Sequence, residues 1–221
     1  MIDLPGSTVH VWRIALDVDD TIVAALERSL EAHEITRSRR FRTRRERRRF
    51  VVSRGGLRQI LGAYLDRAPD TVRFTQGPHG KPALETPGAQ DRLEFSASRS
   101  ADLALCAVVR GRRVGVDVER VRSDFDWKAI AARYQTEAER ERIATLPPQA
   151  QVVAFFEWWT RSEAYVKACG EGLGAGEARL GTEPDPRWSI LALDAGPGFA
   201  AAIAVDGRDV RIVEREASLA A

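Results

Sequence analysis

The chain has 221 residues, 44% of them hydrophobic and 30% charged, and its formal net charge is +2. This balance is typical of a soluble globular protein with one domain or two small packed halves. It contains no apolar run near the roughly 20 residues of a membrane span, no signal-peptide pattern and no C-x-x-C motif around its two cysteines, so we expect a cytoplasmic protein without a disulfide framework or zinc site.

Two elements are predicted before the arginine-rich part of the chain. Residues 9–16 alternate partly between apolar and polar side chains, which predicts a strand. Residues 19–33 carry apolar side chains at helical spacing, and Asp19 or Asp20 would cap the predicted helix.

A run of positive charge follows, with nine arginines between Arg37 and Arg49 and a single acid, Glu46. Such runs are usually solvated or disordered. This one leads into residues 48–65, where a helical stripe of apolar side chains predicts a helix, although a glycine pair weakens the pattern. Arginines on that helix would line a pocket for polyanions. Alternatively, the stretch from Arg37 to Arg58 would make the chain a nucleic-acid-binding protein.

A turn-rich connection, residues 76–84, lies between short predicted strands at residues 72–75 and 93–98. Lys81 stands there between a glycine and a proline, so stiff backbone presents its side chain. An ordinary turn lysine would have the same surroundings.

Two strand-like segments, residues 103–110 and 113–119, flank a turn that contains Gly111, which predicts a hairpin. In the second segment the valines face one side, and Asp117 and Glu119 face the other. Two carboxylates therefore project side by side. Solvated acids on an exposed strand edge would give the same pattern.

Three helices and three strands are predicted for the rest of the chain. The helices are residues 127–134, 136–144 and 149–169, and the strands are residues 188–193, 199–205 and 210–214. Thr136 and Glu139 have the spacing of a capping box, and glycines from Gly170 to Gly176 end the third helix. The order strand, helix, helix, strands thus occurs once in each half.

The third helix carries Trp159, Glu163 and Lys167 at intervals of four residues, so the three share one face. A surface ion pair, worth a few tenths of a kcal/mol, would explain the last two. Glu163 could instead join Asp117 and Glu119, because carboxylate oxygens without histidine or cysteine suit Mg²⁺ or Mn²⁺. Nearby lysines and arginines would then bind phosphates. The residues therefore favour a metal-assisted reaction on a phosphoanhydride.

Several motifs occur in a fixed order along the chain. They are R-F-x-x-x-R-x-x-L-R from Arg49, GKP at residues 80–82, F-x-x-S-x-S at residues 95–100, GVDVER at residues 115–120 and WWTRSEAYVKACGEGL at residues 158–173. The last two follow the patterns G-[VI]-D-[VI]-E and W-[ST]-x-K-E-[AS]-x-x-K-x-x-G-x-G. In this ordered set the chain resembles the Sfp-like type of the 4′-phosphopantetheinyl transferase superfamily.

The resemblance implies an α+β fold of two similar subdomains, residues 1–100 and 101–221, packed about a pseudo-twofold axis with coenzyme A in the cleft between them. It implies transfer of 4′-phosphopantetheine from coenzyme A to a serine of an apo acyl or peptidyl carrier protein, with Mg²⁺ and release of adenosine 3′,5′-bisphosphate. A chain that holds both subdomains would act as a monomer, without a nucleic-acid or membrane partner. The carrier would serve fatty-acid, polyketide or nonribosomal-peptide synthesis.

The resemblance also implies roles for individual residues. Asp117, Glu119 and Glu163 would bind the metal ion, and Glu163 would also be the general base on the carrier serine. Lys167 would stabilise the leaving phosphate. The residues expected to hold coenzyme A are Arg48, Arg54, Lys81, Ser98, Arg99 and Lys167. Of these, Arg48 and Arg54 are the expected partners of its 3′-phosphate, and neighbouring arginines fit that place as well.

Two positions depart from the family pattern. Arg99 stands where the pattern has histidine, and arginine can bind phosphate but cannot accept a proton. Ser162 stands where the pattern has lysine just before the helix glutamate, so one positive charge is lost beside the predicted site. Neither departure changes the three carboxylates.

Overall fold

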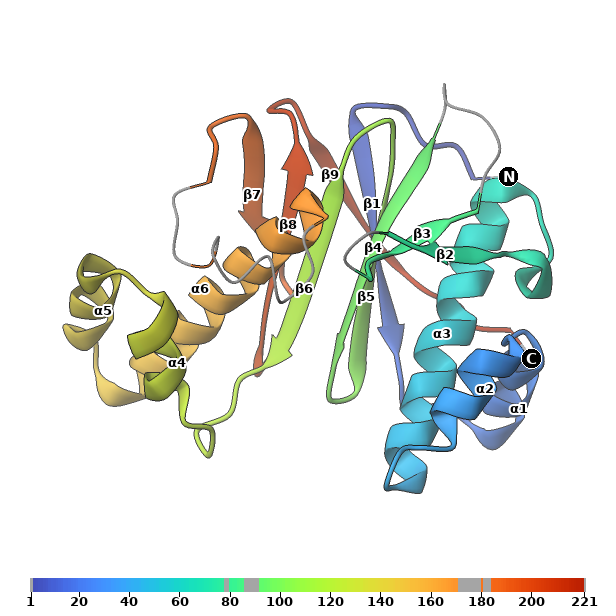
Figure 1. Ribbon diagram of the computed structural model, residues 1–221, viewed down its shortest axis with the longest axis horizontal. Helices are drawn as coiled ribbons and strands as arrows, with labels where there is room; N and C mark the ends of the chain where they lie inside the picture. Colours follow the sequence, from blue (N-terminus) through green and yellow to red (C-terminus); the bar gives the residue numbers. More distant parts are fainter. Residues whose placement is uncertain (1, 78–79, 86–91, 171–179, 181–183, 221) are drawn as a thin grey trace.

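The computed structural model describes residues 2–77, 80–85, 92–170, 180 and 184–220 (Figure 1). The first half contains β1 (Thr8–Ala15), α1 (Asp20–Arg28), α2 (Ala32–Ser38), α3 (Arg44–Leu65), a 3₁₀ turn (Pro69–Thr71), β2 (Phe74–Gln76), β3 (Pro82–Leu84), β4 (Leu93–Ser100) and β5 (Leu103–Arg110). The second half contains β6 (Val114–Arg120), α4 (Trp127–Tyr134), α5 (Glu137–Ala144), α6 (Pro148–Cys169), β7 (Trp188–Ala192), β8 (Phe199–Asp206) and β9 (Arg211–Glu216). The α+β fold with two halves is as predicted.

The strands form two main sheets and one small hairpin. The first sheet has the order β4-β5-β1-β9, in which β1 and β9 run parallel and the other neighbours antiparallel. The second sheet has the antiparallel order β6-β8-β7, and β2 pairs with β3. Two strands that lie after residue 100, β5 and β9, belong to the first sheet.

The predicted hairpin of residues 103–110 and 113–119 is wrong. Both segments are strands, but β5 pairs with β1 and β4, whereas β6 pairs with β8. The short turn carries the chain from one sheet to the other. An apolar face on each strand can be buried by stacking two sheets as well as by pairing within one sheet, so the alternation of residues does not distinguish the two arrangements.

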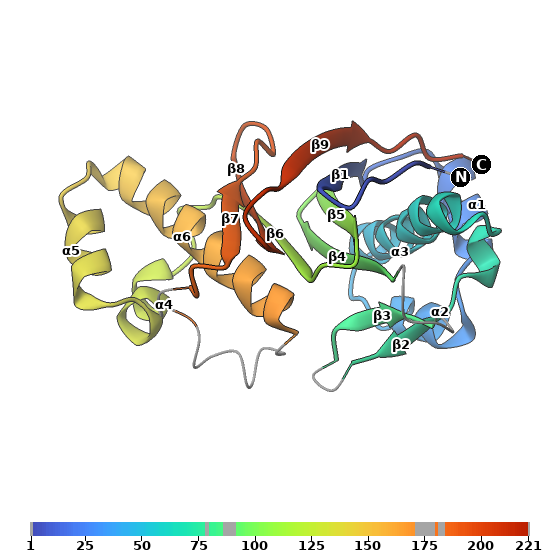
Figure 2. The ribbon, with the colours of Figure 1, turned by 90° about the horizontal axis from the view of Figure 1, so that it is seen from above.

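The molecule has four layers, with a long helix outside each of the two stacked sheets (Figures 1 and 2). α1 and α3 cover the outer face of the first sheet, and α6 covers the outer face of the second. Between the sheets lies a shared core. Its members include Val9, Val11, Leu105, Ala107 and Val109 from the first sheet and Val114, Val116, Val118, Ile203 and Val205 from the second.

The glycine pair within residues 48–65 does not interrupt the helix, because one of the two glycines allows close helix packing. A Cβ atom on Gly55 would lie 2.6 Å from Cβ of Leu26 in α1. The missing side chain therefore lets α1 and α3 touch. α3 extends from Arg44 to Leu65, and a capping box between Thr43 and Glu46 begins it.

The helix predicted at residues 19–33 is two helices, α1 and α2. Asp19 is the N-cap of α1 by position but makes no side-chain capping bond. α1 ends at Arg28, with Ser29 as its C-cap. α2 begins with a capping box between Glu31 and Glu34, in which Glu34 Oε2 accepts a hydrogen bond from the amide of Glu31. This local capping competes with a continuous helix and breaks it.

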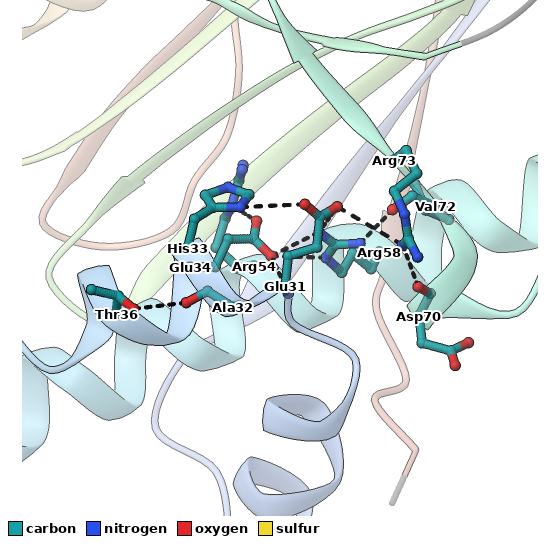
Figure 3. A network of polar contacts seen from close by, with 10 residues as sticks. All are labelled: Glu31, Ala32, His33, Glu34, Thr36, Arg54, Arg58, Asp70, Val72 and Arg73. Carbon is teal, nitrogen blue, oxygen red and sulfur yellow. Dashed lines mark hydrogen bonds and ion pairs between the residues drawn. The ribbon is translucent and has the colours of Figure 1, made fainter.

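A buried ion-pair network joins α2 to α3 (Figure 3). Arg58 is fully buried, and its Nη2 lies 2.7 Å from Glu34 Oε2 and 3.0 Å from Glu31 Oε1. Its Nη1 donates to the carbonyl oxygen of Val72, and Arg54 Nε donates to Glu34 Oε1 at 2.8 Å. Arg58 therefore does not line a pocket for polyanions, contrary to the sequence-based expectation, because the acids of α2 neutralise it inside the protein.

This network should make stability depend on pH. Burial would raise the pKa of Glu34, but the amide of Glu31 and the guanidinium groups of Arg54 and Arg58 outweigh burial and lower the pKa. A lowered folded-state pKa adds stability above the unfolded-state pKa, and this stability is lost as pH falls through the folded-state value. We expect Glu34→Gln to lower the free energy of unfolding by about 3 kcal/mol at pH 7, because Arg58 loses its nearest carboxylate inside the protein.

Urea unfolding at pH 7 and at lower pH checks this expectation. The difference between wild type and Glu34→Gln should shrink below a pH of about 4.3, the ordinary range of a glutamate pKa. The double variant Glu34→Gln/Arg58→Met is the control, since removing the buried charge together with its partner should recover part of the loss. An equal loss at both pH values would show that shape, rather than the ion pair, determines the effect.

In the described part of the chain, no helix is both long enough and apolar enough to cross a membrane.

Candidate active site

The acidic face of β6 lies against α6. A Cβ atom on Gly115 would overlap the carbonyl oxygen of Ala164 and lie 2.5 Å from the amide nitrogen of Ala168. Only glycine therefore allows this approach. The close approach brings Glu163 and Lys167, one turn apart on α6, to the side of β6 that carries the carboxylates. The valines of β6 face the shared core, as the alternation predicted.

Asp117 is buried at the centre of this contact, with 3% of its surface exposed. Its Oδ1 accepts hydrogen bonds from Ser98 Oγ at 2.7 Å and Lys167 Nζ at 2.5 Å. Its Oδ2 is buried and has no hydrogen-bond partner among the described residues. One oxygen of this carboxylate is therefore held in place, and the other is left for a ligand.

Glu119 and Glu163 are the other two carboxylates. Glu119 Oε2 accepts a hydrogen bond from Ser100 Oγ at 2.6 Å, and burial together with the charge of Asp117 raises the pKa of Glu119. Glu163 is 5% exposed, and its Oε1 is buried without a partner in the described structure. Burial raises the pKa of Glu163 to about 6, helped by the charges of Asp117 and Glu119 and opposed by Lys167. The charges of Asp117 and Glu119 both act on Glu163, which is consistent with the three acids lying near one another.

Lys167 does not form the exposed helix-surface ion pair that would explain its spacing from Glu163. Its Nζ instead binds Asp117 Oδ1, Ser98 Oγ at 3.2 Å and the carbonyl oxygen of Val116 at 3.4 Å. The lysine thus reaches from α6 across β6 to β4, and it contacts both halves of the protein.

Lys81 lies close to the same strand. Its Nζ donates to the carbonyl oxygen of Val114 at 2.7 Å. Burial lowers the pKa of Lys81 to about 8, with a further contribution from Lys167. Its side chain is therefore fixed against β6 rather than free in solvent, which differs from an ordinary turn lysine.

Ser96 and Ser100 belong to the same contact; Ser100 was part of the F-x-x-S-x-S motif, but neither serine was assigned a role from the sequence. Ser96 Oγ accepts a hydrogen bond from the amide of Val116, and Ser100 Oγ accepts one from the amide of Arg120. Serines at positions 96, 98 and 100 occupy every second position of the strand. This spacing places all three hydroxyl groups on one side of β4, and it could have indicated their shared role.

The predicted coenzyme A arginines lie in different surroundings. Arg48 pairs with Asp20 and donates to the carbonyl oxygen of Val18, and Arg54 pairs with Glu34. Other arginines of α3 are paired in the same way. They are Arg44 with Asp20, Arg45 and Arg49 with Asp17, and Arg47 with Glu27. The nucleic-acid hypothesis therefore loses its main support, because acids of the same chain already neutralise much of this charge.

Arg99, in contrast, lies over aromatic rings beside another arginine. Its guanidinium group is 5.5 Å from the ring centre of Phe41 and 5.8 Å from that of Phe50, and Arg37 lies 5.6 Å from the same Phe50 ring. Partial burial, Arg37 and Arg49 lower the pKa of Arg99, with Glu46 acting in the opposite direction. Like charges gathered in this way favour the binding of an anion.

A pocket of about 430 Å³ lies between α5, α6 and β7, and Ser162 lines it together with Trp158, Arg161 and Tyr165. None of the three carboxylates lines this pocket. The departure at Ser162 therefore changes the lining of a neighbouring pocket and leaves the acidic cluster intact.

The residues fit a hard metal ion in their chemistry. Within the described ranges, no three histidine, cysteine, aspartate or glutamate side chains are gathered closely enough to hold an ion by themselves. Mg²⁺ typically takes one or two protein carboxylates and completes its shell with water and phosphate oxygens. The buried oxygens without partners, Asp117 Oδ2 and Glu163 Oε1, match that requirement.

Comparison with known proteins identifies relatives of the chain. Residues 113–209 match the family described as the 4′-phosphopantetheinyl transferase superfamily. Over 215 residues the chain is 39% identical to 4′-phosphopantetheinyl transferase HetI of Nostoc sp., covering 93% of this chain and 91% of that protein. It is 31% identical over 134 residues to 4′-phosphopantetheinyl transferase gsp of Aneurinibacillus migulanus, covering 57% of this chain and 53% of that protein.

The similarity to the Nostoc protein extends over most of both chains. The chain therefore belongs to the 4′-phosphopantetheinyl transferase superfamily, and its activity is 4′-phosphopantetheinyl transfer to carrier proteins.

Proposed function

We propose that this chain takes the 4′-phosphopantetheine arm from coenzyme A and attaches it to a serine hydroxyl of an apo carrier protein, in a reaction that requires Mg²⁺. The serine oxygen forms a bond to the β-phosphorus of coenzyme A, the pyrophosphate bond breaks, and adenosine 3′,5′-bisphosphate leaves. The observation that carries this proposal is the pair of buried carboxylate oxygens without partners, Asp117 Oδ2 and Glu163 Oε1, beside the Lys167 ammonium group.

Asp117, Glu119 and Glu163 would hold the metal ion. When bound, Mg²⁺ would neutralise charge on the pyrophosphate and on the departing phosphate. Three acids of like charge in a partly buried site favour such a cation, because each raises the energy of its ionised neighbours. The raised pKa values of Glu119 and Glu163 are consistent with burial and with this repulsion between the carboxylates.

Glu163 is the proposed general base. A base works best when its pKa lies near the working pH, and burial raises the pKa of Glu163 to about 6. At pH 7 most of this group is ionised, so it can accept the proton of the attacking serine, directly or through water.

Lys167, Lys81 and Ser98 would bind the phosphates. Lys167 already spans β6 and β4, where its ammonium group could meet charge that develops on the leaving phosphate. Lys81 and Ser98 lie on the other half of the protein, so coenzyme A held by these groups would contact both halves.

The 3′-phosphate is assigned to the basic surface of the first half. Arg48 and Arg54, the expected partners, would have to exchange Asp20 and Glu34 for the phosphate. Arg99 and Arg37 have no ion pair among the contacts of the described residues and therefore need no exchange. We include all four in the proposed site and expect Arg99 to contribute most.

The test is the intact mass of an apo carrier protein after incubation with the enzyme, coenzyme A and Mg²⁺. A gain of one phosphopantetheine is expected with wild type. Lys167→Ala should reduce the rate by about 10²-fold, since removal of one such electrostatic contact commonly costs this much. A transfer rate for Lys167→Ala within about threefold of wild type would contradict the role of Lys167, because it corresponds to a change of less than about 0.7 kcal/mol in the activation barrier. No mass gain with any apo carrier would contradict the proposed donor and acceptor.

A further inference from the structure

Strands β4 and β6 lie side by side where the two halves meet, although they belong to different sheets (Figure 1). No backbone pairing between them is present among the described residues. The side-chain contacts join residues 19 or 20 positions apart at each end of the strands, so β4 and β6 run in the same direction. We call this contact the β4–β6 seam.

Side chains replace a neighbouring strand along the open edge of β6. The carbonyl oxygens of Val114 and Val116 accept hydrogen bonds from Lys81 and Lys167. The amides of Val116 and Arg120 donate to the hydroxyl groups of Ser96 and Ser100. The amides and carbonyls of an edge strand need hydrogen-bond partners. Side chains from outside β6 supply them here, and they fix in place the strand that carries Asp117 and Glu119.

Ser100 makes a second bond that Ser96 does not. Its hydroxyl accepts from the Arg120 amide at 3.1 Å and donates to Glu119 Oε2 at 2.6 Å. The Ser96 hydroxyl accepts from the Val116 amide at 3.1 Å, and no carboxylate contact is recorded for it in the described structure. Ser96 thus binds only a backbone amide of β6, whereas Ser100 binds both a backbone amide and a carboxylate of β6.

We propose that Ser100 is a positioning residue that holds the Glu119 carboxylate in the orientation needed for the metal ion. The inference rests on the proposed function, in which Glu119 is a metal ligand. Because the amide of Arg120 uses one lone pair of the hydroxyl, its hydrogen is directed to Glu119. A half-buried carboxylate beside two other acids would otherwise turn away from them, towards Arg122 and solvent.

Residues of this kind act on the reaction through the metal ligand that they orient. Residues that orient metal ligands typically contribute 10- to 100-fold in metal affinity or activity. We therefore expect Ser100→Ala to raise the Mg²⁺ concentration for half-maximal transfer by about tenfold. Turnover at saturating Mg²⁺ should stay within about threefold of wild type, because the ion itself can then orient Glu119.

The experiment compares three variants in the full chain. Transfer to an apo carrier is measured against Mg²⁺ concentration, and the rise in thermal midpoint caused by Mg²⁺ with coenzyme A is measured without the carrier. Ser100→Ala should need more Mg²⁺ in both measurements. Ser96→Ala, which removes only a backbone partner, should lower the midpoint but leave the Mg²⁺ requirement within about twofold of wild type. Ser100→Thr keeps the hydroxyl and should restore the wild-type requirement.

The outcomes separate this inference from the proposed function. If Ser100→Ala and Ser96→Ala show the same Mg²⁺ requirement while Asp117→Asn raises it, the positioning role of Ser100 is wrong and the metal site stands. If Asp117→Asn leaves the Mg²⁺ requirement unchanged, the metal site itself is wrong. If Ser100→Ala does not fold, Ser100→Cys provides the same comparison, because a thiol is a weak donor of similar size. In a Glu119→Ala background, Ser100→Ala should add no further change in Mg²⁺ requirement.

Discussion

Replacing Asp117 with asparagine should reduce the rate of transfer at saturating Mg²⁺ by about 10²- to 10³-fold, the range seen when one charge-stabilising group is removed from an active site. Asparagine keeps the shape of the side chain and can still accept from Ser98 and Lys167. It removes the negative charge, however, from the most buried carboxylate of the site. Steady-state assays with coenzyme A and an apo carrier measure the effect.

The fold should survive this substitution. The side chain of Lys167 is 29% exposed, so its ammonium group can remain hydrated when Asp117 loses its charge. Equal urea midpoints would demonstrate this. Asp209→Asn is the matched control, because Asp209 is exposed and lies in the loop before β9. A rate for Asp117→Asn as high as that of the control would remove Asp117 from the catalytic site.

Gly115→Ala should strongly destabilise the protein. The new methyl group would overlap the carbonyl oxygen of Ala164 and approach the amide of Ala168 to 2.5 Å. These are backbone atoms of α6, so the helix must move as a whole. We expect a loss of about 3 kcal/mol or more in the free energy of unfolding, at the upper end of overpacking effects. Activity should fall as well, since Glu163 and Lys167 move with α6.

Chemical denaturation measures the loss, and Gly6→Ala is its control. A Cβ atom on Gly6 would meet no atom within 4 Å, so this variant should stay within about 1 kcal/mol of wild type. Similar stabilities for the two variants would mean that β6 and α6 are not in close backbone contact.

Local patterns predicted most elements and the chemistry of the site. The long helix that ends at Gly170 and the capping box of Thr136 and Glu139 are both present. The alternation in residues 113–119 correctly separated the core valines from Asp117 and Glu119, because strand geometry fixes opposite faces for neighbouring residues. Gly172, Gly174 and Gly176 lie outside the described residues.

Contacts between distant segments could not be predicted in the same way. The turn at Gly111 fits a hairpin or a change of sheet equally well, and only the stacking of both sheets decides between them. Arg58 looks like its exposed neighbours in sequence, but it is enclosed by acids of α2. The role of Ser100 depends on β6 lying across from β4, and no local pattern in residues 93–100 specifies that neighbour.

The parallel pairing of β9 with β1 has a consequence for the order of synthesis. Thr8 lies opposite Arg211, so the first strand must wait for residues made some two hundred positions later. At ribosomal speeds of about 5 to 20 residues per second, that delay is about ten to forty seconds. Until then one edge of β1 has no strand beside it, and exposed edges invite pairing with other chains. During this interval the first sheet can assemble from β4, β5 and β1, with β1 as an edge strand that β9 covers only at the end of synthesis.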